Sequence, residues 1–307
     1  MDTNQEFTQV VSGLRDNIQK VMIGKREVID LVLTALLSRG HVLLEDVPGT
    51  GKTMLAKSLA KSLDASFARL QLTPDLLPSD VTGLNYFDQK EGGFVFSPGP
   101  VFCNILLADE INRATPRTQS SLLECMEEHQ VTVDGVTRVL ERPFFVIATQ
   151  NPVETAGTFP LPEAQLDRFL LKINMGFPSR EEEVQIMQRF METSPLGTLS
   201  AVCDQQTIIS LQDAVKKVYI HPLLQTYIAD LALATRQNSA VALGVSPRGS
   251  LAMLSACRAY ALLQGRGYVV PEDIKTLAAP VFAHRLVLSG DVTALGADNI
   301  IANILSA

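Results

Sequence analysis

The sequence predicts an α/β fold in which a parallel sheet is sandwiched by helices, followed by an all-α second domain. Three short apolar runs, at residues 41–45, 104–110 and 144–152, have the length of buried strands and are separated by segments with helical periodicity. Strands that alternate with helices form parallel sheets whose two faces are both covered. Later in the chain every regular pattern is helical, so we expect one domain at residues 1–178 and a second at residues 179–307.

Amphipathic helices open the chain. Apolar residues between Phe7 and Val21 recur at helical spacing, and residues 28–40 form a second helix that Gly40 closes. A third helix, at residues 53–63, follows the first strand. Residues 71–101 are rich in proline, glycine and phenylalanine and show no regular pattern. The phenylalanines of this stretch could pack in the core or grip another molecule.

The middle of the chain adds a helix and a hairpin to the sheet. Residues 115–129 have one apolar side, typical of a helix. The pair Asp134-Gly135 lies between β-branched residues and predicts a hairpin over residues 131–139. A last core strand at 170–177 precedes the second domain. Its helices are expected at residues 181–191, 207–217, 222–237, 247–265 and 271–286.

The composition is that of a soluble globular protein. Of 307 residues, 46% are hydrophobic and 19% are charged, with a net charge of −7 that disfavours wrapping of nucleic acid by bulk charge. No apolar run approaches the length of a membrane span. The first residues are polar and lack the apolar stretch of a signal peptide, so we expect a cytoplasmic protein. The four cysteines are scattered and predict reduced thiols rather than zinc ligands or disulfides.

A glycine-containing loop with the sequence DVPGTGKT, residues 46–53, lies between the first strand and the third helix. Gly49 and Gly51 let the backbone curl so that successive amides point at phosphate oxygens. Lys52 can reach the β- and γ-phosphates, and the Thr53 hydroxyl can bind Mg²⁺. The expected lining of this loop also includes Val47, Pro48, Thr50 and Met54. The alternative is a tight turn with no ligand.

The first loop position departs from the usual pattern, because Asp46 stands where glycine is usual. Aspartate tolerates unusual backbone angles better than most residues. Its carboxylate must point away from the nucleotide, because otherwise binding is weakened.

Two acids follow the second apolar run, ILLADE, at residues 105–110. Asp109 is expected to hold Mg²⁺, a hard cation that prefers oxygen ligands. Glu110 is expected to polarise the attacking water as a general base. The alternative is a solvated pair of acids at the end of a strand.

Three further polar residues suit a phosphate-transfer site. Asn151 ends the third strand and can contact the γ-phosphate or the water, although Asn-Pro is also a common turn. Arg168 precedes the last core strand and can stabilise transferring phosphoryl charge on a neighbouring subunit; the alternative is a salt bridge to Asp167 or Glu163. Arg248 begins a helix of the second domain and can report the γ-phosphate to that domain, or lie in solvent.

Taken in this order, the motifs resemble those of the AAA+ ATPases, and the wording LADEINRATPRTQSSLLECMEE, ATQNP and LPEAQLDRF resembles the MoxR family in particular. The resemblance covers essentially the whole chain. It implies ATP and Mg²⁺ as ligands, with Ile23 and Gly24 touching the adenine. It also implies that residues 83–100 and 131–139 are family insertions, which face the pore in related rings.

The resemblance further implies a hexameric ring with ATP between subunits. MoxR-like proteins remodel or activate client proteins, which often carry von Willebrand A domains, and the work can include insertion of a cofactor or metal. Two other functions remain open from the residues alone. One is a nucleic-acid motor, disfavoured by the acidic charge. The other is a nucleotide-gated scaffold with little turnover, disfavoured by the intact acid pair Asp109-Glu110.

Overall fold

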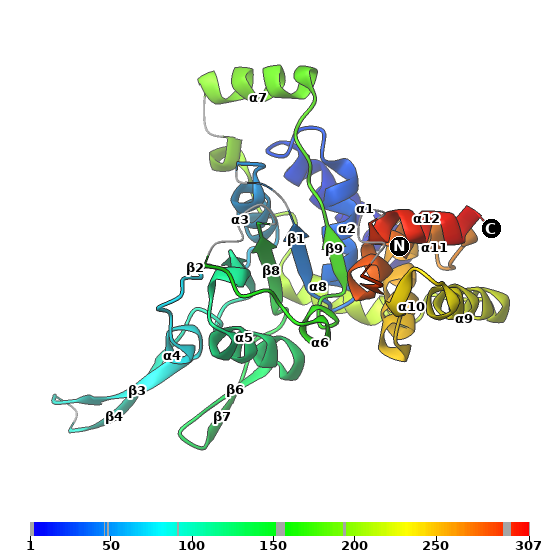
Figure 1. Cartoon of the computed structure of the whole chain (residues 1–307). Coiled ribbons are helices and arrows are strands. Elements are labelled where there is room, and N and C mark those ends of the chain that lie inside the picture. The colour runs from blue at the N-terminus through cyan, green and yellow to red at the C-terminus, as the bar shows by residue number, and fades with distance from the viewer. Residues whose placement is uncertain are drawn as a thin grey trace.

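The protein is built around one parallel sheet with helices on both faces (Figure 1). The computed structural model describes residues 3–45, 47, 49–90, 92–151, 157–192, 195–290 and 296–306. The sheet has the strand order β2-β5-β8-β1-β9, and every pairing is parallel. Its strands are β1 (Val42–Glu45), β2 (Phe67–Gln71), β5 (Ile105–Asp109), β8 (Phe145–Gln150) and β9 (Leu171–Ile173). The predicted parallel sheet is therefore confirmed.

Alternate residues of the central strands face two different hydrophobic clusters. On β5, Ile105 and Leu107 belong to one cluster, and Leu106 and Ala108 belong to the other. This period of two is the geometry of a strand buried on both faces. The first cluster is covered by α1 (Thr3–Gln19), α2 (Arg26–Leu37) and α3 (Lys52–Ser62). The second is covered by α4 (Pro78–Thr82) and α5 (Pro116–Glu128).

Helices dominate the second half of the chain, as predicted. They are α6 (Glu163–Leu166), α7 (Arg180–Glu192), α8 (Gln205–Val215), α9 (Pro222–Gln237), α10 (Pro247–Leu263), α11 (Pro271–Phe282) and α12 (Ala297–Ser306). Short 3₁₀ turns are η1 (Ile111–Arg113), η2 (Pro195–Thr198) and η3 (Ala283–Arg285). The sequence patterns did not predict α12, nor the small antiparallel pair of β10 (Val241–Leu243) and β11 (Val287–Leu288).

Local side chains explain where several of these helices begin. Thr115, Asp204 and Ser246 each precede a helix and accept a hydrogen bond from the amide three residues later. In α5 and α10 proline fills the first helical position, where no amide hydrogen is needed.

The helices from α8 to α12, which we call the lid, share one core with the sheet. The first hydrophobic cluster continues from α2 into α8, α10 and α11 without interruption. Helix α7 stands apart from this cluster, at the top of Figure 1. The domain boundary after residue 178 stays a prediction.

Two β-hairpins project together from the sheet layer, at the lower left of Figure 1. One joins β3 (Gly83–Asp88) to β4 (Gly93–Pro98), within a stretch for which the sequence predicted no regular structure. The other joins β6 (Gln130–Val133) to β7 (Val136–Val139) through the predicted turn, where Asp134 and Gly135 have φ angles of 51° and 78°. The hairpins touch, because Asn85 Nδ2 donates to Asp134 Oδ2 over 2.7 Å.

Two of the three phenylalanines of the first hairpin, Phe87 and Phe94, lie outside the core. Phe87 and Phe94 are 54% and 77% exposed and pack edge to face against each other. Phe96 lies under the guanidinium of Arg138, 3.7 Å from its ring centre, which ties this hairpin to the second. Core packing, the other reading of these aromatics, is wrong for Phe87 and Phe94.

The cysteines are free, as predicted, and Cys103, Cys125 and Cys257 are buried. Burial raises the pKa of the Cys103 and Cys125 thiols to about 12, which keeps them protonated and unreactive at neutral pH. None of the helices in the described ranges combines the length and the apolar character that crossing a bilayer requires.

Candidate functional site

The glycine loop and α3 meet the carboxyl ends of the strands, where parallel sheets bind their ligands. Gly49 and Gly51 have φ angles of 89° and 94°, in the left-handed region that glycine alone enters without strain. Helix α3 begins at Lys52 directly after Gly51, which as a glycine has no side chain to cap the first turn. The first amides of a helix have no carbonyl partner within the helix, and such a helix start suits an anion.

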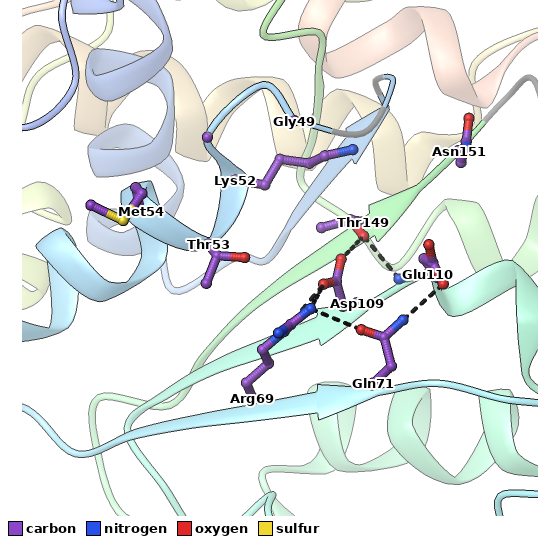
Figure 2. A pocket seen from close by; sticks show the side chains of 11 residues that line it. Gly49, Lys52, Thr53, Met54, Arg69, Gln71, Asp109, Glu110, Thr149 and Asn151 are labelled. Atoms are coloured by element: carbon purple, nitrogen blue, oxygen red, sulfur yellow. Dashed lines mark hydrogen bonds and ion pairs between the residues drawn. The ribbon is translucent and has the colours of Figure 1, made fainter. Parts of the chain in front are cut away.

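A pocket of about 390 Å³ lies in front of this helix start (Figure 2). It gathers residues from the loop, from α3 and from the ends of three strands. Its lining is Gly49, Gly51, Lys52, Thr53, Met54, Arg69, Gln71, Asp109, Glu110, Thr149 and Asn151. The sequence predicted eight of these eleven side chains or backbone positions, and the structure brings those eight together in one cavity.

The two acids are fixed by a neighbouring strand. Thr149 Oγ1 on β8 donates to Asp109 Oδ1 over 2.6 Å and accepts from the amide of Glu110 over 2.9 Å. Glu110 itself has a φ of 58°, an unusual angle for a residue with a side chain. Backbone strain of this kind is concentrated at functional sites. Thr149 thus orients both acids at once, a role that sequence reasoning missed.

A second pair of missed residues lies at the end of β2. The guanidinium of Arg69 donates to Asp109 Oδ2 over 2.7 Å from Nη2 and 3.3 Å from Nε. The same Nη2 donates to Gln71 Oε1 over 2.9 Å, and Gln71 Nε2 donates to Glu110 Oε2 over 2.7 Å. Figure 2 shows this run of bonds from one acid to the other. Arg69 and Gln71 are two apart on one strand, so both face the pocket.

An apolar pocket of about 260 Å³ adjoins the glycine loop on its other side. Val21, Met22 and Ile23 line it from the segment between α1 and α2, where adenine contacts were expected. Pro178, Ile186 and Phe190, which were not predicted, line it from the segment around α7. Such a pocket suits a flat aromatic base.

Gly24 lies beside this apolar pocket rather than among its lining residues. A Cβ on Gly24 would meet Glu182 Oε1 at 1.7 Å, and the φ of 71° also requires glycine. The close approach of Glu182, a side chain of α7, therefore explains why position 24 is a glycine.

The two predicted arginines lie together, away from both pockets. Arg168 Nε and Arg248 Nη2 contact the two oxygens of Glu127, over 3.0 Å and 2.9 Å. This carboxylate at the end of α5 is 37% exposed, and Arg248 is 49% exposed. We name these three residues the Glu127 cluster. Arg248, expected to report the γ-phosphate to the second domain, pairs with Glu127 beside Arg168, and its contact with a phosphate stays a prediction.

The segment that carries Arg168 is hydrogen-bonded to the lid. Arg285, almost fully buried, donates to Asp167 Oδ1 over 2.6 Å and to the backbone oxygen of Phe169 over 2.7 Å. Asp167 therefore pairs with Arg285, so the alternative of an Arg168–Asp167 salt bridge is wrong. Because Arg285 belongs to η3 in the lid, the position of Arg168 depends on the lid.

Three further residues of the glycine loop were expected to line the site or to affect its nucleotide binding. Asp46 and Pro48 are outside the described residues. Thr50 Oγ1 donates to the Val47 backbone oxygen over 3.3 Å, which tightens the loop before the helix.

The residues present fit a magnesium nucleotide. The start of α3 offers amides, Lys52 offers a cation, and Asp109 and Thr53 offer the oxygen ligands that Mg²⁺ prefers. A Cβ built on Gly49 meets nothing within 4 Å, so there is open space beside the loop at this residue. The adjoining apolar pocket completes a site with a polar and an apolar half.

Comparison with known proteins agrees with this geometry. Residues 41–171 match the ATPase family associated with various cellular activities (AAA), and residues 233–303 match the AAA lid domain. The uncharacterized protein YeaC of Bacillus subtilis is 52% identical over 95% of this chain and 92% of its own. Chaperone MoxR1 of Mycobacterium tuberculosis is 42% identical over 90% of this chain and 75% of its own.

A solved structure extends the likeness to the whole fold. A crystal structure from Cytophaga hutchinsonii, of a protein proposed to be an ATPase, superposes with a TM-score of 0.93 at 37% identity. The match covers 99% of this chain and 96% of the other. On its sequence relatives, its fold and its nucleotide pocket, the chain belongs to the MoxR family of AAA+ ATPases.

Proposed function

We propose that this ATPase binds Mg-ATP across the two joined pockets and hydrolyses it with help from a neighbouring copy in a ring. The observation that carries the proposal is the division of the charged groups. The groups that suit binding and water activation line one cavity, whereas Arg168 and Arg248 lie together elsewhere on the same chain.

Within one chain the roles follow from position. The amides at the start of α3 and the Lys52 ammonium hold the phosphates, and Met22, Ile23 and Met54 contact the base. Thr53 and Asp109 hold Mg²⁺. When bound, the metal neutralises charge that develops on the transferring phosphoryl group.

Glu110 accepts a proton from the attacking water, and Asn151 hydrogen-bonds the water or the γ-phosphate. Thr149 keeps Asp109 and Glu110 in register, since it bonds the carboxylate of one and the amide of the other. A general base of this kind contributes about 10²–10⁴-fold to a rate.

The arginines complete the site of the next subunit. Arg168 and Arg248 are both exposed enough to leave Glu127 and face a second chain. A guanidinium supplied in trans stabilises transition-state charge without weakening nucleotide binding in its own chain. A closed ring, hexameric by family resemblance, gives every pocket such a neighbour. Arg248 then senses the neighbour's γ-phosphate rather than its own.

The product of the cycle is mechanical work on a client protein. Two observations support this: a relative of this chain is named a chaperone, and Phe87 and Phe94 expose an aromatic pair at the end of a projecting hairpin. A client with a von Willebrand A domain, and insertion of a cofactor or metal into it, are the forms of this work that the family resemblance implies.

The test of the ATPase assignment is steady-state ATP turnover of Glu110→Gln. We expect turnover to fall by about 10²-fold or more while nucleotide binding is retained, because only the proton acceptor is lost. Glu124→Gln, an exposed acid on α5, is the matched control and should behave as wild type. Near wild-type turnover of Glu110→Gln would sink the assignment.

A further inference from the structure

The carboxylate that is expected to hold magnesium already has a cation. Both oxygens of Asp109 are engaged: Oδ1 by the Thr149 hydroxyl and Oδ2 by the Arg69 guanidinium. The Thr149 bond is compatible with a bound metal, since a hydroxyl orients a carboxylate without changing the local charge. The Arg69 bond competes with a metal, because a guanidinium and Mg²⁺ are both positively charged and repel each other at the same oxygen.

Arg69 is well built for holding Asp109 in the absence of metal. Two of its nitrogens reach Asp109 Oδ2, and Gln71 Oε1 accepts from Nη2 over 2.9 Å, so the guanidinium is fixed from two sides. Its side chain is 48% exposed, whereas that of Asp109 is only 16% exposed. The arginine can therefore swing into solvent at small cost, but the acid cannot.

We propose that Arg69 is an internal counter-ion of the magnesium site, which occupies Asp109 until metal binds and must then withdraw. The proposal rests on the assignment of Asp109 as a magnesium ligand. The geometry gives the arginine a protective role. Without it, the metal-free site would hold a partly buried carboxylate beside Glu110 and beside an incoming triphosphate.

The withdrawal has a consequence for Glu110. An amide side chain has one acceptor end and one donor end. With Arg69 at the acceptor end of Gln71, the donor end faces Glu110 and holds its Oε2 over 2.7 Å. When Arg69 leaves, nothing on β2 fixes this orientation, and the hold on Glu110 Oε2 is left mainly to Arg113 Nε, 3.1 Å away. Metal occupancy therefore loosens one of the two contacts that hold the general base.

The experiment measures how strongly magnesium strengthens binding of the non-hydrolysable ATP analogue AMP-PNP. Calorimetric Kd values are taken in EDTA and in saturating Mg²⁺, and their ratio is compared between proteins. In Arg69→Gln we expect the ratio to rise roughly threefold to tenfold, because binding in EDTA weakens and binding with metal tightens.

The matched control is Arg113→Gln. Arg113 Nε pairs with Glu110 Oε2 over 3.1 Å, so this variant removes one positive charge near the same pocket and leaves the Arg69–Asp109 pair intact. Its ratio should stay within about twofold of wild type. Arg69→Lys keeps the charge but not the forked geometry, should give an intermediate ratio, and serves as the test if Arg69→Gln does not fold.

Three results would overturn the proposal. An unchanged ratio with both Kd values weakened would mean that Arg69 binds the nucleotide itself. A lowered ratio would mean that Arg69 assists the metal. An equal rise in Arg113→Gln would mean that any nearby charge has the effect. If wild type bound no AMP-PNP at all, the proposed function would fail instead, so the two failures are distinguishable.

Discussion

The pocket in front of α3 and the Glu127 cluster both contain groups suited to phosphate, yet they are built differently. In the pocket, Lys52, Asp109 and Glu110 lie on the loop and strand ends of one rigid sheet, and Thr149 fixes the acids from the next strand. In the Glu127 cluster, Arg168 and Arg248 come from the sheet layer and from the lid, and one half-exposed carboxylate holds both.

This difference shows where motion can enter the cycle. Groups on a sheet keep their geometry, which binding and proton transfer require. Groups on two elements joined by an exposed ion pair can separate at small cost. The proposed function therefore divides the chain into a preorganised half-site and a movable half-site, and it expects the second to follow the lid through the bond from Arg285 to Asp167.

The largest expected effect on turnover comes from removing an arginine of the movable half-site. Arg168→Ala should lower turnover by about 10³-fold or more, because a guanidinium in trans contributes that much to phosphoryl transfer. Its nucleotide Kd should remain within about twofold, since the pocket is untouched. Turnover and calorimetric affinity together check this, and a large loss of affinity would place Arg168 in its own chain's site.

The converse substitution removes a charged group from the preorganised half-site and is expected to affect nucleotide affinity. Lys52→Ala should weaken Mg-ATP binding by about 10²-fold, because a charge-assisted contact to the phosphates is lost. Calorimetry measures the affinity. Lys57→Ala, on the same helix but outside the pocket lining, is the control and should bind normally.

His41 is buried between β8 and α5 and gives the protein a pH dependence. Its Nδ1 accepts from the amide of Val146 on β8, and its Nε2 lies 3.0 Å from the Met126 backbone oxygen, next to Glu127. Full burial lowers the pKa of His41 from 6.5 to about 4. Between these values the unfolded chain binds more protons, so stability is complete above pH 6.5 and is lost as the pH falls toward 4.

At pH 5 the expected loss from His41 is about 2 kcal/mol of unfolding free energy, or roughly 30-fold in the folding equilibrium. Urea unfolding at pH 7.5 and pH 5 measures it. His41→Gln should flatten the dependence, although buried His284, whose pKa is also lowered by burial, will keep part of it. His221→Gln, an exposed histidine, is the control. An equal pH dependence in wild type and His41→Gln would contradict the account.

The smallest expected effect is at Glu127, the carboxylate that holds both arginines of the movable half-site. Glu127→Gln keeps the shape of the side chain but removes the charge that holds Arg168 and Arg248. We expect turnover to rise by about threefold or less, since exposed ion pairs contribute little. A large fall in turnover would show that Glu127 has a further role in the active ring.

The sequence predicted the parts that carry strong local patterns. The length of the short apolar runs predicted the three central strands, and the spacing of Gly49, Gly51 and Lys52 predicted the loop, because backbone geometry there depends on the residues themselves. Strand β2 was missed, since FARLQ has only one fully buried residue and lacks an apolar run. With β2 unrecognised, Arg69 and Gln71 had no place in the site.

Other features depend on contacts between distant segments. Nothing near Arg248 in the sequence indicates Glu127, which is 121 residues away. The apolar pocket draws Phe190 and Ile186 from α7, far from the glycine loop in sequence. The β3–β4 hairpin was hidden because glycine and proline mark its ends, whereas its strands alternate only weakly between buried and exposed residues.

The most direct test of the divided site mixes two inactive proteins. Arg168→Ala retains a sound pocket, and Glu110→Gln retains a sound arginine, so a mixed ring contains interfaces with both intact. We predict that ATP turnover of the mixture exceeds that of either variant by at least about tenfold. If turnover of the mixture equalled the average of the two variants at every ratio, Arg168 would not act on a neighbour and the account would be contradicted.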